Sequence, residues 1–524
     1  MKSLRRTRVD RHKHAPPLRA QDAYVVAGMV VVLLIGAGVL ALQRMGDAWA
    51  PQRDPRPRAT IRAAPGSNDD VKEDRAPAPP PPPQPINKSF EGLTTFRGNA
   101  TRTYYGEGPI PTRPEILWAY PRGGGLCSES IDQHGSRLWC GTGWTGQPNV
   151  VEAGKGRTEV RFGAYDRGVH FIDAKTGRKV RNTFFTGDLI KGSITSDPDG
   201  YPLLYTGSRD DHFHVLALDR GKTPVGLWSL SADSAPNPVW NNDWDGSALV
   251  IDDYLLEGGE NSWFYVVKLN RDYDKDGKVT VDPEIKVMAP GFDDQLFAEL
   301  GDDNVSIEGS VAFHDGVAYF ANSGGLVQGW DISDVLEGGD KFRRVFRFWT
   351  GDDTDASVVI DRDGYLYVAS EHERLNTRAE QVGQLMKLDP DRKKKPLVWS
   401  VPVPSEGGAG GLWATPALYG NAVYATTNSG RLLAVTKGHG RIAWELQLQG
   451  PTWSSPIAVD DTLIVGDCGG ELHAYDVRRP LKGPPKELWT VTLPGCIEST
   501  PALWKGRIYV GTRGGKFYAI GDRG

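Results

Sequence analysis

The chain has 524 residues, including 63 glycines, 37 prolines and 16 tryptophans, and a formal net charge of −5 at pH 7. A net charge this small argues against a general nucleic-acid-binding protein, which would carry a basic surplus. The length allows several ordinary domains or one large repeat domain, and the many glycines and prolines favour short strands joined by turns.

The first 42 residues have the pattern of a membrane anchor. Residues 1–22 form a basic tail, and residues 23–42 are an uncharged apolar stretch long enough to cross a bilayer as a helix. The basic flank is expected to stay in the cytoplasm, which places the rest of the chain outside it. A cleaved signal peptide is the alternative, but the apolar run exceeds the usual ~7–15 residues of such signals. We therefore expect a single-pass protein of the cell (inner) membrane.

Residues 43–90 are predicted to be a disordered linker. The segment is charged first and then rich in proline over residues 76–85. Such a sequence cannot bury a core and favours extended polyproline II, at ~3 Å per residue. It would act as a spacer between the membrane and a globular domain at residues 91–524.

That domain is predicted to contain eight copies of one unit. Each copy has a strand that ends in a small-residue turn, at residues 139–142, 205–208, 256–259, 319–322, 367–370, 424–427, 464–467 and 509–512. The strand before it opens on a hydroxyl residue, at Ser130, Thr195, Ser247, Ser310, Ser357, Thr415, Ser455 and Thr500. A spacing of about 40 to 66 residues lies within or above the range of propeller blades.

The eighth copy lacks a fourth strand. Residues 114–120 (PEILWAY) precede the first copy and resemble residues 487–491 (ELWTV), the fourth strand of the seventh copy. A ring in which the N-terminal strand completes the last sheet removes the open edge of a linear array. The predicted fold is therefore all-β, an eight-bladed β-propeller closed by an N-terminal strand.

Three motifs resemble those of the PQQ-like β-propeller repeat proteins. Residues 96–99 (FRGN), followed by Arg102 and Thr103, look like the motif at the start of these propellers. Residues 173–177 (DAKTG) resemble their turn between strands three and four, and residues 500–520 match their repeat core. The family includes quinoprotein dehydrogenases and the propeller subunit of the outer-membrane barrel-assembly complex. The resemblance implies the fold but no single function, because one propeller scaffold supports many activities.

The channel mouth is expected to be acidic with an aromatic segment. Two residues before the opening Ser or Thr, four copies have an acid and two have Trp: Asp245, Glu308, Asp355, Glu498, Trp413 and Trp453. Clustered carboxylates raise one another's pKa or recruit a cation. In the alternative, each accepts backbone hydrogen bonds in its own turn. Such a ring would repel the tricarboxylate PQQ unless a metal intervened.

Two long insertions, residues 143–163 and 371–383, are expected on the same face, where recognition usually lies. Residues 240–246 (WNNDWDG) enter the third copy there. Trp240 and Trp244 are candidates for peptide or sugar contacts, and packing at a blade junction is the alternative.

The four cysteines all map to the mouth side. Cys127 opens the first copy and Cys140 ends its second strand, while Cys468 and Cys496 belong to the seventh and eighth copies. An even number outside the cytoplasm favours disulfides, and we predict the pairs Cys127–Cys140 and Cys468–Cys496. Zinc is the alternative, although the sequence has no Cys-x-x-Cys spacing.

Residues 272–278 (DYDKDGK) form a Asp-x-Asp-x-Asp-Gly loop, the start of a calcium site. The predicted set is Asp272, Asp274, Asp276, Lys278 and Asp282, with Glu284 as another candidate to close the shell. An acidic hairpin tip is the alternative. The loop lies on the side away from the mouth, so calcium here would be structural.

These features favour a membrane-anchored extracytoplasmic scaffold that binds other envelope proteins, with no catalytic residue assigned. The alternatives are a PQQ- and calcium-dependent quinoprotein dehydrogenase and an envelope ligand or polysaccharide sensor. The resemblance implies that a dehydrogenase would need a calcium in the channel and usually an adjacent cysteine pair. The sequence has no adjacent cysteines and no Cys-x-x-Cys-His haem motif, so PQQ is not expected.

Overall fold

The computed structural model describes residues 61–62, 83–132, 135–143, 146–405 and 410–523. All elements below belong to the second of two units, Ala59–Gly524. The predicted membrane helix at residues 23–42 and most of the predicted linker lie outside the described residues. Within the described ranges, no helix is long and apolar enough to cross a membrane.

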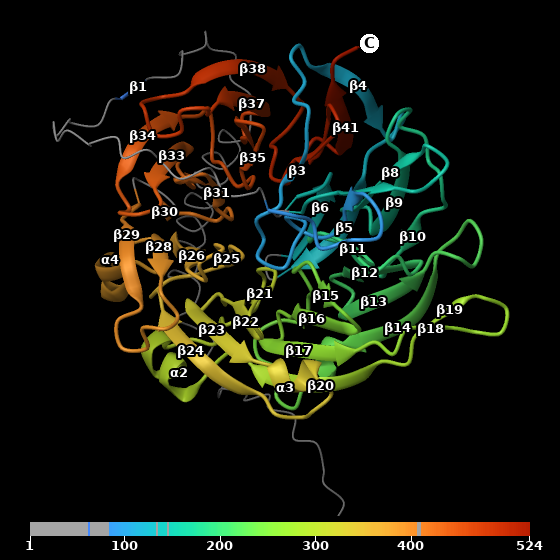
Figure 1. The fold of residues 1–524 in the computed structure, drawn as a ribbon, viewed down its shortest axis with the longest axis horizontal. Coiled ribbons are helices and arrows are strands. Elements are labelled where there is room, and N and C mark those ends of the chain that lie inside the picture. The colour runs from blue at the N-terminus through green and yellow to red at the C-terminus, as the bar shows by residue number, and fades with distance from the viewer. Residues whose placement is uncertain (1–60, 63–82, 133–134, 144–145, 406–409, 524) are drawn as a thin grey trace, which may run out of the picture. The chain divides into compact units, whose positions relative to one another are not determined.

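Eight sheets follow one another around a ring, and each forms one blade with four antiparallel strands (Figure 1). In blades one, six and eight, a two-residue strand from the N-terminal part of the chain adds a fifth strand. Blade one comprises β7 (Asn149–Glu152), β8 (Thr158–Gly163), β9 (Gly168–Asp173) and β10 (Phe184–Phe185), and blade two comprises β11 (Thr195–Ser196), β12 (Leu203–Gly207), β13 (His212–Ala217) and β14 (Val225–Ser231). Blade three comprises β15 (Leu249–Ile251), β16 (Tyr254–Gly258), β17 (Trp263–Lys268) and β20 (Glu284–Pro290), and blade four comprises β21 (Ala312–His314), β22 (Val317–Phe320), β23 (Leu326–Asp331) and β24 (Arg343–Trp349).

The second half of the ring repeats this arrangement. Blade five comprises β25 (Val359–Ile360), β26 (Leu366–Ala369), β28 (Leu385–Leu388) and β29 (Leu397–Val401), and blade six comprises β31 (Ala417–Tyr419), β32 (Ala422–Thr426), β33 (Arg431–Thr436) and β34 (Ile442–Gln447), with β1 (Ile61–Arg62) along β34. Blade seven comprises β35 (Ile457–Val459), β36 (Thr462–Gly466), β37 (Glu471–Asp476) and β38 (Lys486–Thr492), and blade eight comprises β39 (Ala502–Trp504), β40 (Arg507–Thr512), β41 (Lys516–Gly521) and β4 (Glu115–Tyr120).

Short helices and hairpins fill the connections between these strands. The α-helices are α2 (Asp294–Leu300), α3 (Ser333–Leu336) and α4 (Thr377–Val382), and a 3-10 helix, η1 (Ala232–Ser234), follows β14. The accessory strand pairs are β18 (Asp272–Tyr273) with β19 (Val279–Thr280) and β27 (Glu371–His372) with β30 (Gly410–Gly411). Helix α4 and β27 lie within the predicted insertion at residues 371–383.

The burial of each strand follows from its place in a stack of blades. Middle strands such as β12 and β36 are covered on both faces, so they are buried along their whole length and read as nearly continuous apolar runs. Outer strands such as β38 have one free edge and are largely exposed. Apolar clusters join neighbouring blades, including one that joins blade eight to blade one through Phe517 and Phe162.

The predicted closing strand is confirmed. Strand β4 pairs antiparallel with β41, with Tyr120 opposite Phe517 and Ala119 opposite Tyr518. The Trp118 indole also donates a hydrogen bond to the Ala174 carbonyl of blade one, at 3.0 Å. The first and last parts of the domain therefore share one sheet, and the ring has no open edge there.

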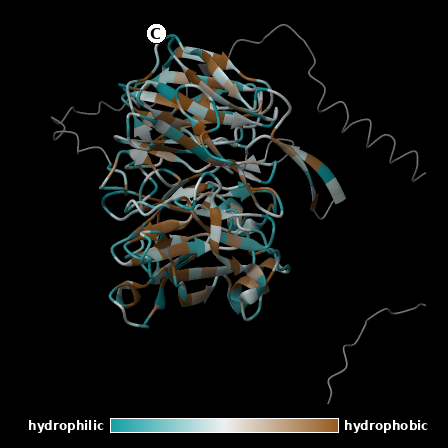
Figure 2. Ribbon diagram, turned by 90° about the vertical axis from the view of Figure 1, so that its right-hand side faces the viewer, coloured by the Kyte–Doolittle hydropathy of each residue, from teal (hydrophilic) through white to brown (hydrophobic). Residues whose placement is uncertain are grey.

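The predicted first and second strands of blade one are wrong, whereas the third, predicted at residues 169–172, is β9. Residues 127–140 form a separate hairpin of β5 (Cys127–Asp132) and β6 (Gly135–Cys140), and blade one begins only at β7. Residues 143–163, predicted as an insertion, contain β7 and β8. At the height of β5 and β6 in Figure 1, Figure 2 shows a hairpin that stands out from the ring. The prediction took this hairpin for two blade strands because its residues alternate between apolar and polar and it ends in Cys-Gly-Thr, as a blade strand would.

Residues 94–105 form a plug in the centre of the ring. The plug lies at the end of the channel opposite the mouth, which is described below. The strand β2 (Gly92–Leu93) before it pairs with β7, and β3 (Gly106–Glu107) after it pairs with β39. Between them, backbone carbonyls accept hydrogen bonds from blades two, four and five: Ser196 to Thr94, Phe313 to Ala100 and Ile360 to Thr101.

Two buried arginines attach this plug to the remaining blades. The Arg97 guanidinium donates to the carbonyls of Thr415, Pro416 and Pro456, in blades six and seven, at 2.7–2.8 Å. The Arg102 guanidinium donates to the carbonyls of Ser247 and Val311, in blades three and four. Burial lowers the pKa of Arg97 to about 10 and that of Arg102 to about 9. Arg97 and Arg102 therefore have a structural role, and the segment from β2 to β3 as a whole contacts every blade.

Candidate functional site

A repeated backbone hydrogen bond places equivalent residues around the other end of the channel. In blades two to eight, the N–H of a residue after the second strand donates to a carbonyl in the loop that leads into the same blade, at 2.7–3.0 Å. We call the donors the turn ring: Arg209, Glu260, Ser323, Glu371, Asn428, Cys468 and Arg513. The acceptors are Leu189, Asp243, Ser306, Asp353, Gly411, Pro451 and Cys496.

The residue two positions after each acceptor belongs to a second set, which we call the mouth ring. Its members are Lys191, Asp245, Glu308, Asp355, Trp413, Trp453 and Glu498. Six of the seven are the predicted mouth residues. The prediction missed Lys191 because it took Thr195 as the opening residue of blade two, where Ser193 holds the equivalent position.

The opening hydroxyls explain why this position prefers Ser or Thr. Each accepts the backbone N–H of its counterpart in the preceding blade: Ser193 from Gln147, Ser310 from Ser247, Ser357 from Ser310, Thr415 from Ser357 and Ser455 from Thr415, at 2.7–3.1 Å. These bonds between neighbouring blades satisfy buried backbone donors. They also hold the mouth ring, two residues upstream, in register.

The first cluster of acids at the mouth is neutralised by basic residues of the chain. Asp243, Asp245 and Glu260 form this first triad, and Lys191 Nζ lies 2.9 Å from Glu260, 3.5 Å from Asp243 and in close contact with Asp245. Arg209 Nε lies 2.6 Å from Asp243. Burial alone would lower the pKa of Lys191, but Asp245 and Glu260 hold it well above its usual value.

A second triad of acids occupies the same positions two blades further on. The carboxylate oxygens of Asp353, Asp355 and Glu371 lie within 4.8 Å of one another. Asp353 and Glu371 are only 6% and 7% exposed, and Asp353 Oδ1 has no hydrogen-bond partner. Among the described residues, no basic side chain forms an ion pair with any of the three. Burial and the neighbouring Asp355 carboxylate raise the pKa of Asp353 and Glu371 well above their usual values.

Glu308 and the tryptophans adjoin the second triad. Burial, followed by the charge of Asp355, raises the pKa of Glu308. Trp413 Nε1 donates to Asp355 Oδ2 at 3.1 Å, and the Trp413 and Trp453 rings meet edge to face with centroids 5.0 Å apart. The structure therefore brings two of the predicted acids, Glu308 and Asp355, close to the predicted aromatic segment.

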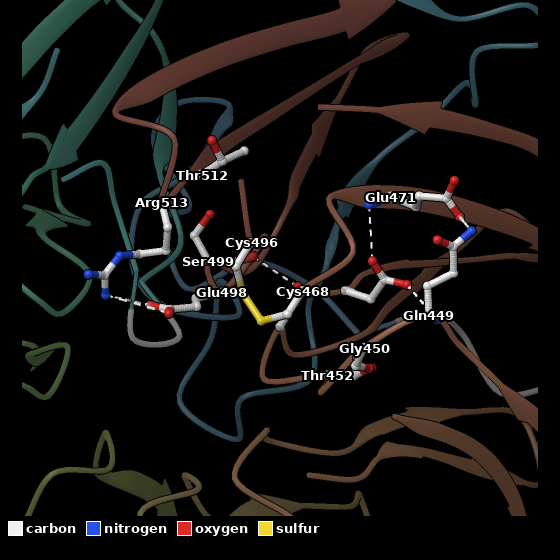
Figure 3. The surroundings of a disulfide bond; sticks show 12 residues. Gln449, Gly450, Thr452, Cys468, Glu471, Cys496, Glu498, Ser499, Thr512 and Arg513 are labelled. Carbon is white, nitrogen blue, oxygen red and sulfur yellow. Dashed lines mark hydrogen bonds and ion pairs between the residues drawn. A yellow bond between two sulfur atoms is a disulfide. The ribbon is translucent and has the colours of Figure 1, made fainter. Parts of the chain in front are cut away.

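The last predicted acid, Glu498, lies beside a disulfide and an arginine (Figure 3). Arg513 Nη1 is 3.3 Å from Glu498 Oε2, and the Cys468–Cys496 disulfide lies next to this pair. The Arg513 guanidinium also stacks over the Trp139 ring of the β5–β6 hairpin, 4.9 Å from its centroid. The second predicted disulfide, Cys127–Cys140, closes the base of that hairpin. Both predicted disulfides are confirmed.

The two tryptophans before blade three occupy different environments. Trp244 is buried and packs against Phe213 and Tyr265 at the junction of blades two and three. It therefore does not line the mouth, and its assignment as a binding residue is corrected. Trp240 is 46% exposed and stays a candidate contact residue.

The predicted calcium residues do not converge in the described structure. Asp274 Oδ1 accepts the N–H groups of Asp276 and Lys278, each at 2.9 Å, and so closes the β18–β19 turn. Lys278 Nζ donates to the Asp219 carbonyl, and the Asp282 carbonyl accepts from Asn270. Calcium at this loop stays a prediction. Potential metal ligands do converge at the two triads and, in blade seven, at Asp467, Glu471 and His473.

Comparisons with known proteins agree with this architecture. The sequence model of the family described as outer membrane protein assembly factor BamB matches residues 338–479. A search among curated proteins finds no match.

Solved structures with the same fold include two quinoprotein enzymes. Quinohemoprotein alcohol dehydrogenase from Comamonas testosteroni is 13% identical with a TM-score of 0.51, covering 83% of this chain and 81% of its own. A europium-containing methanol dehydrogenase is 13% identical with a TM-score of 0.52, covering 83% and 99%. BamB from Moraxella catarrhalis is 14% identical with a TM-score of 0.37, covering 79% and 99%. Residues 338–479 are thus similar in sequence to the BamB family, and the chain shares the β-propeller fold of the two quinoprotein enzymes.

Proposed function

We propose that the protein is a membrane-anchored, extracytoplasmic scaffold of the bacterial cell envelope that binds another protein at the mouth face. Three observations support this proposal. The plug occupies the opposite end of the channel, the BamB family description names an assembly factor, and the sequence of residues 23–42 has the length of a membrane anchor.

The observation that carries the proposal is the β5–β6 hairpin. Ile131 and Leu138 are 74% and 66% exposed. Leu138 lies opposite Glu129 in the register, and Ile131 is two residues from Glu129, so both apolar side chains share the outward face. Such side chains on a projecting, disulfide-closed element would be shielded from water by a bound protein.

The inward face of the same hairpin is fixed to the propeller. Ser130 Oγ donates to Asp188 at 3.0 Å, and the Trp139 ring meets the Tyr165 ring with centroids 5.5 Å apart. The Cys127–Cys140 disulfide constrains the base. Because the hairpin is held before a partner arrives, less conformational entropy is lost on binding.

The quinoprotein alternative meets an electrostatic obstacle at the mouth. PQQ carries three carboxylates, whereas Glu308, Asp353, Asp355 and Glu371 have no ion-pair partner among the described residues. Like charges in a buried site repel strongly. The residues at the mouth therefore do not fit PQQ by themselves, and we assign no redox step to this protein.

A photo-crosslinking amino acid at position 131 tests the scaffold. In membranes carrying the full chain, illumination is expected to attach one defined protein to this position, identified by mass spectrometry. Leu488 is an exposed apolar residue on the outer strand of blade seven and provides the matched control.

A second experiment places the photo-crosslinking amino acid at position 129. The double substitution I131S/L138S is then expected to reduce the yield of the adduct at least about fivefold, because it removes an apolar hot spot of binding. Equal adducts from positions 131 and 488, or none from position 131, would contradict the scaffold.

A further inference from the structure

We infer that the second triad, Asp353, Asp355 and Glu371, binds a primary ammonium group, supplied by a lysine side chain of a partner or by a small amine. This inference rests on the proposed function in taking the mouth as the face that ligands reach. It adds the chemical class that the mouth recognises.

The first step of the argument is that the two triads are the same site repeated in two blades. Glu260 N–H donates to the Asp243 carbonyl at 3.0 Å, and Glu371 N–H donates to the Asp353 carbonyl at 2.7 Å. Asp245 and Asp355 then each precede the opening serine of their blade by two residues. The three carboxylates of each triad come from matching positions, and in both triads they lie within 4.8 Å of one another.

The second step is that the first triad already binds an ammonium group. Lys191, the mouth-ring residue of the preceding blade, places Nζ within 3.5 Å of all three carboxylates. The protein thereby shows which cation this arrangement of acids accommodates.

The third step is that the second triad receives no such group from the described part of the chain. Its preceding mouth-ring residue is Glu308, a carboxylate in place of the lysine, and no basic side chain forms an ion pair with the triad. The guanidinium of Arg374, nearby in sequence, is directed to Asp302 and to the carbonyls of Asn304 and Ser323. Asp353 Oδ1, buried in the triad, has no partner.

The fourth step concerns which cation suits the oxygens. Both oxygens of Asp355 accept hydrogen bonds, from Ser323 and Trp413, and Glu371 Oε2 accepts one from Asn428. A calcium ion takes six to eight oxygen ligands, whereas an ammonium group has three N–H donors, one for each carboxylate. The neighbouring Trp413 and Trp453 rings favour an organic cation through their faces and apolar edges.

The residues in and around the second triad differ in their exposure to solvent. Asp355, Glu308, Trp413 and Trp453 are partly exposed, whereas Asp353 and Glu371 lie deeper. A chain such as a lysine side chain, with an ammonium tip and an aliphatic stem, could pass the tryptophans and reach the deeper carboxylates.

Isothermal titration calorimetry on the detergent-solubilised full chain provides the direct test. The probes are N-acetyl-lysine methylamide, cadaverine and calcium chloride, each added separately. We expect one equivalent of amine to bind, and the tighter of the two amine probes identifies the source. E371Q and D353N are expected to weaken amine binding about tenfold or more. E471Q in the blade-seven cluster is the matched control and should leave it unchanged.

The substitution E308K is the decisive variant because it recreates the arrangement around Lys191. The new lysine is expected to enter the second triad, abolish amine binding and raise the Tm. Amine binding that survives E308K, or a Tm lowered by it, would overturn the inference. Calcium binding that excludes the amines would also overturn it, because the triad would then be a metal site.

These outcomes are separable from those of the crosslinking experiment. The calorimetry uses no partner protein, so amine binding can hold while position 131 forms no adduct, and the reverse. Failure of one experiment therefore identifies which proposal is wrong.

Discussion

The buried charged side chains form two groups. One group joins the blades at the plug, and the other lies at the mouth. Arg97 and Arg102 satisfy backbone carbonyls of several blades, whereas the two triads face the opposite end. The sequence predicted the acids of the mouth ring because they stand at a constant distance from the opening Ser or Thr. It could not predict the triads, because Asp353 and Glu371 meet only after β26 turns back beside the incoming loop. Nor could it reveal that Lys191 neutralises one triad and leaves its counterpart without a basic partner.

The buried residue Glu257, in β16, gives the fold a pH dependence. Burial raises its pKa from 4.5 to about 8, although the charge of Arg102 opposes this. The folded state holds the proton of Glu257 more tightly than the unfolded state does. Its contribution to the stability of the folded protein is therefore complete below about pH 4.5 and is lost as the pH rises through about 8. We expect the Tm to fall between pH 5 and pH 8, and E257Q, which stays neutral, to flatten that fall.

Differential scanning fluorimetry at a series of pH values measures this effect. The exposed Glu284 of β20 provides the control, because E284Q should keep the wild-type slope. An E257Q profile parallel to wild type would show that Glu257 does not hold the proton.

At the scale of elements, the sequence predicted most blades but not the β5–β6 hairpin, which lies between β4 and blade one. Small-residue turns and opening hydroxyls recur in most blades because each strand meets the same neighbours on both sides. The β5–β6 hairpin has the same local sequence pattern, but the propeller covers only one of its faces. The sequence pattern of a hairpin does not show how many of its faces are covered. The closing strand was predictable because its sequence resembles the fourth strand of blade seven, and both carry a tryptophan in the same environment.

Deleting residues 114–121 is expected to abolish cooperative unfolding or cause aggregation, because β41 would lose its partner strand and blade eight its outer edge. Circular dichroism melting of the purified chain measures this. The matched control replaces residues 127–140, which belong to no blade, with a short Gly-Ser linker and should retain a cooperative transition. A cooperative melt of the first deletion would show that closure does not depend on β4.

At the scale of the whole molecule, we predict a tethered propeller. The full chain is expected to sediment with membranes and resist extraction by high salt, whereas a chain starting at residue 43 should not sediment. Protease added to spheroplasts should reach the propeller side of the anchor and spare an epitope on the basic tail. Protection of the propeller side, or release of both chains by salt, would contradict this topology.

The plug has a further consequence for how the chain is made. Residues 94–105 leave the ribosome early, but the blade carbonyls that Arg97 and Arg102 bind belong to residues 247–456, and β3 and β4 pair with strands after residue 500. Contacts this distant in sequence make folding slow and expose unfinished sheets. The ring cannot be completed blade by blade during synthesis, so the last strands must arrive before the first segment finds its place. Fragments that end before blade eight should therefore need a chaperone or be degraded.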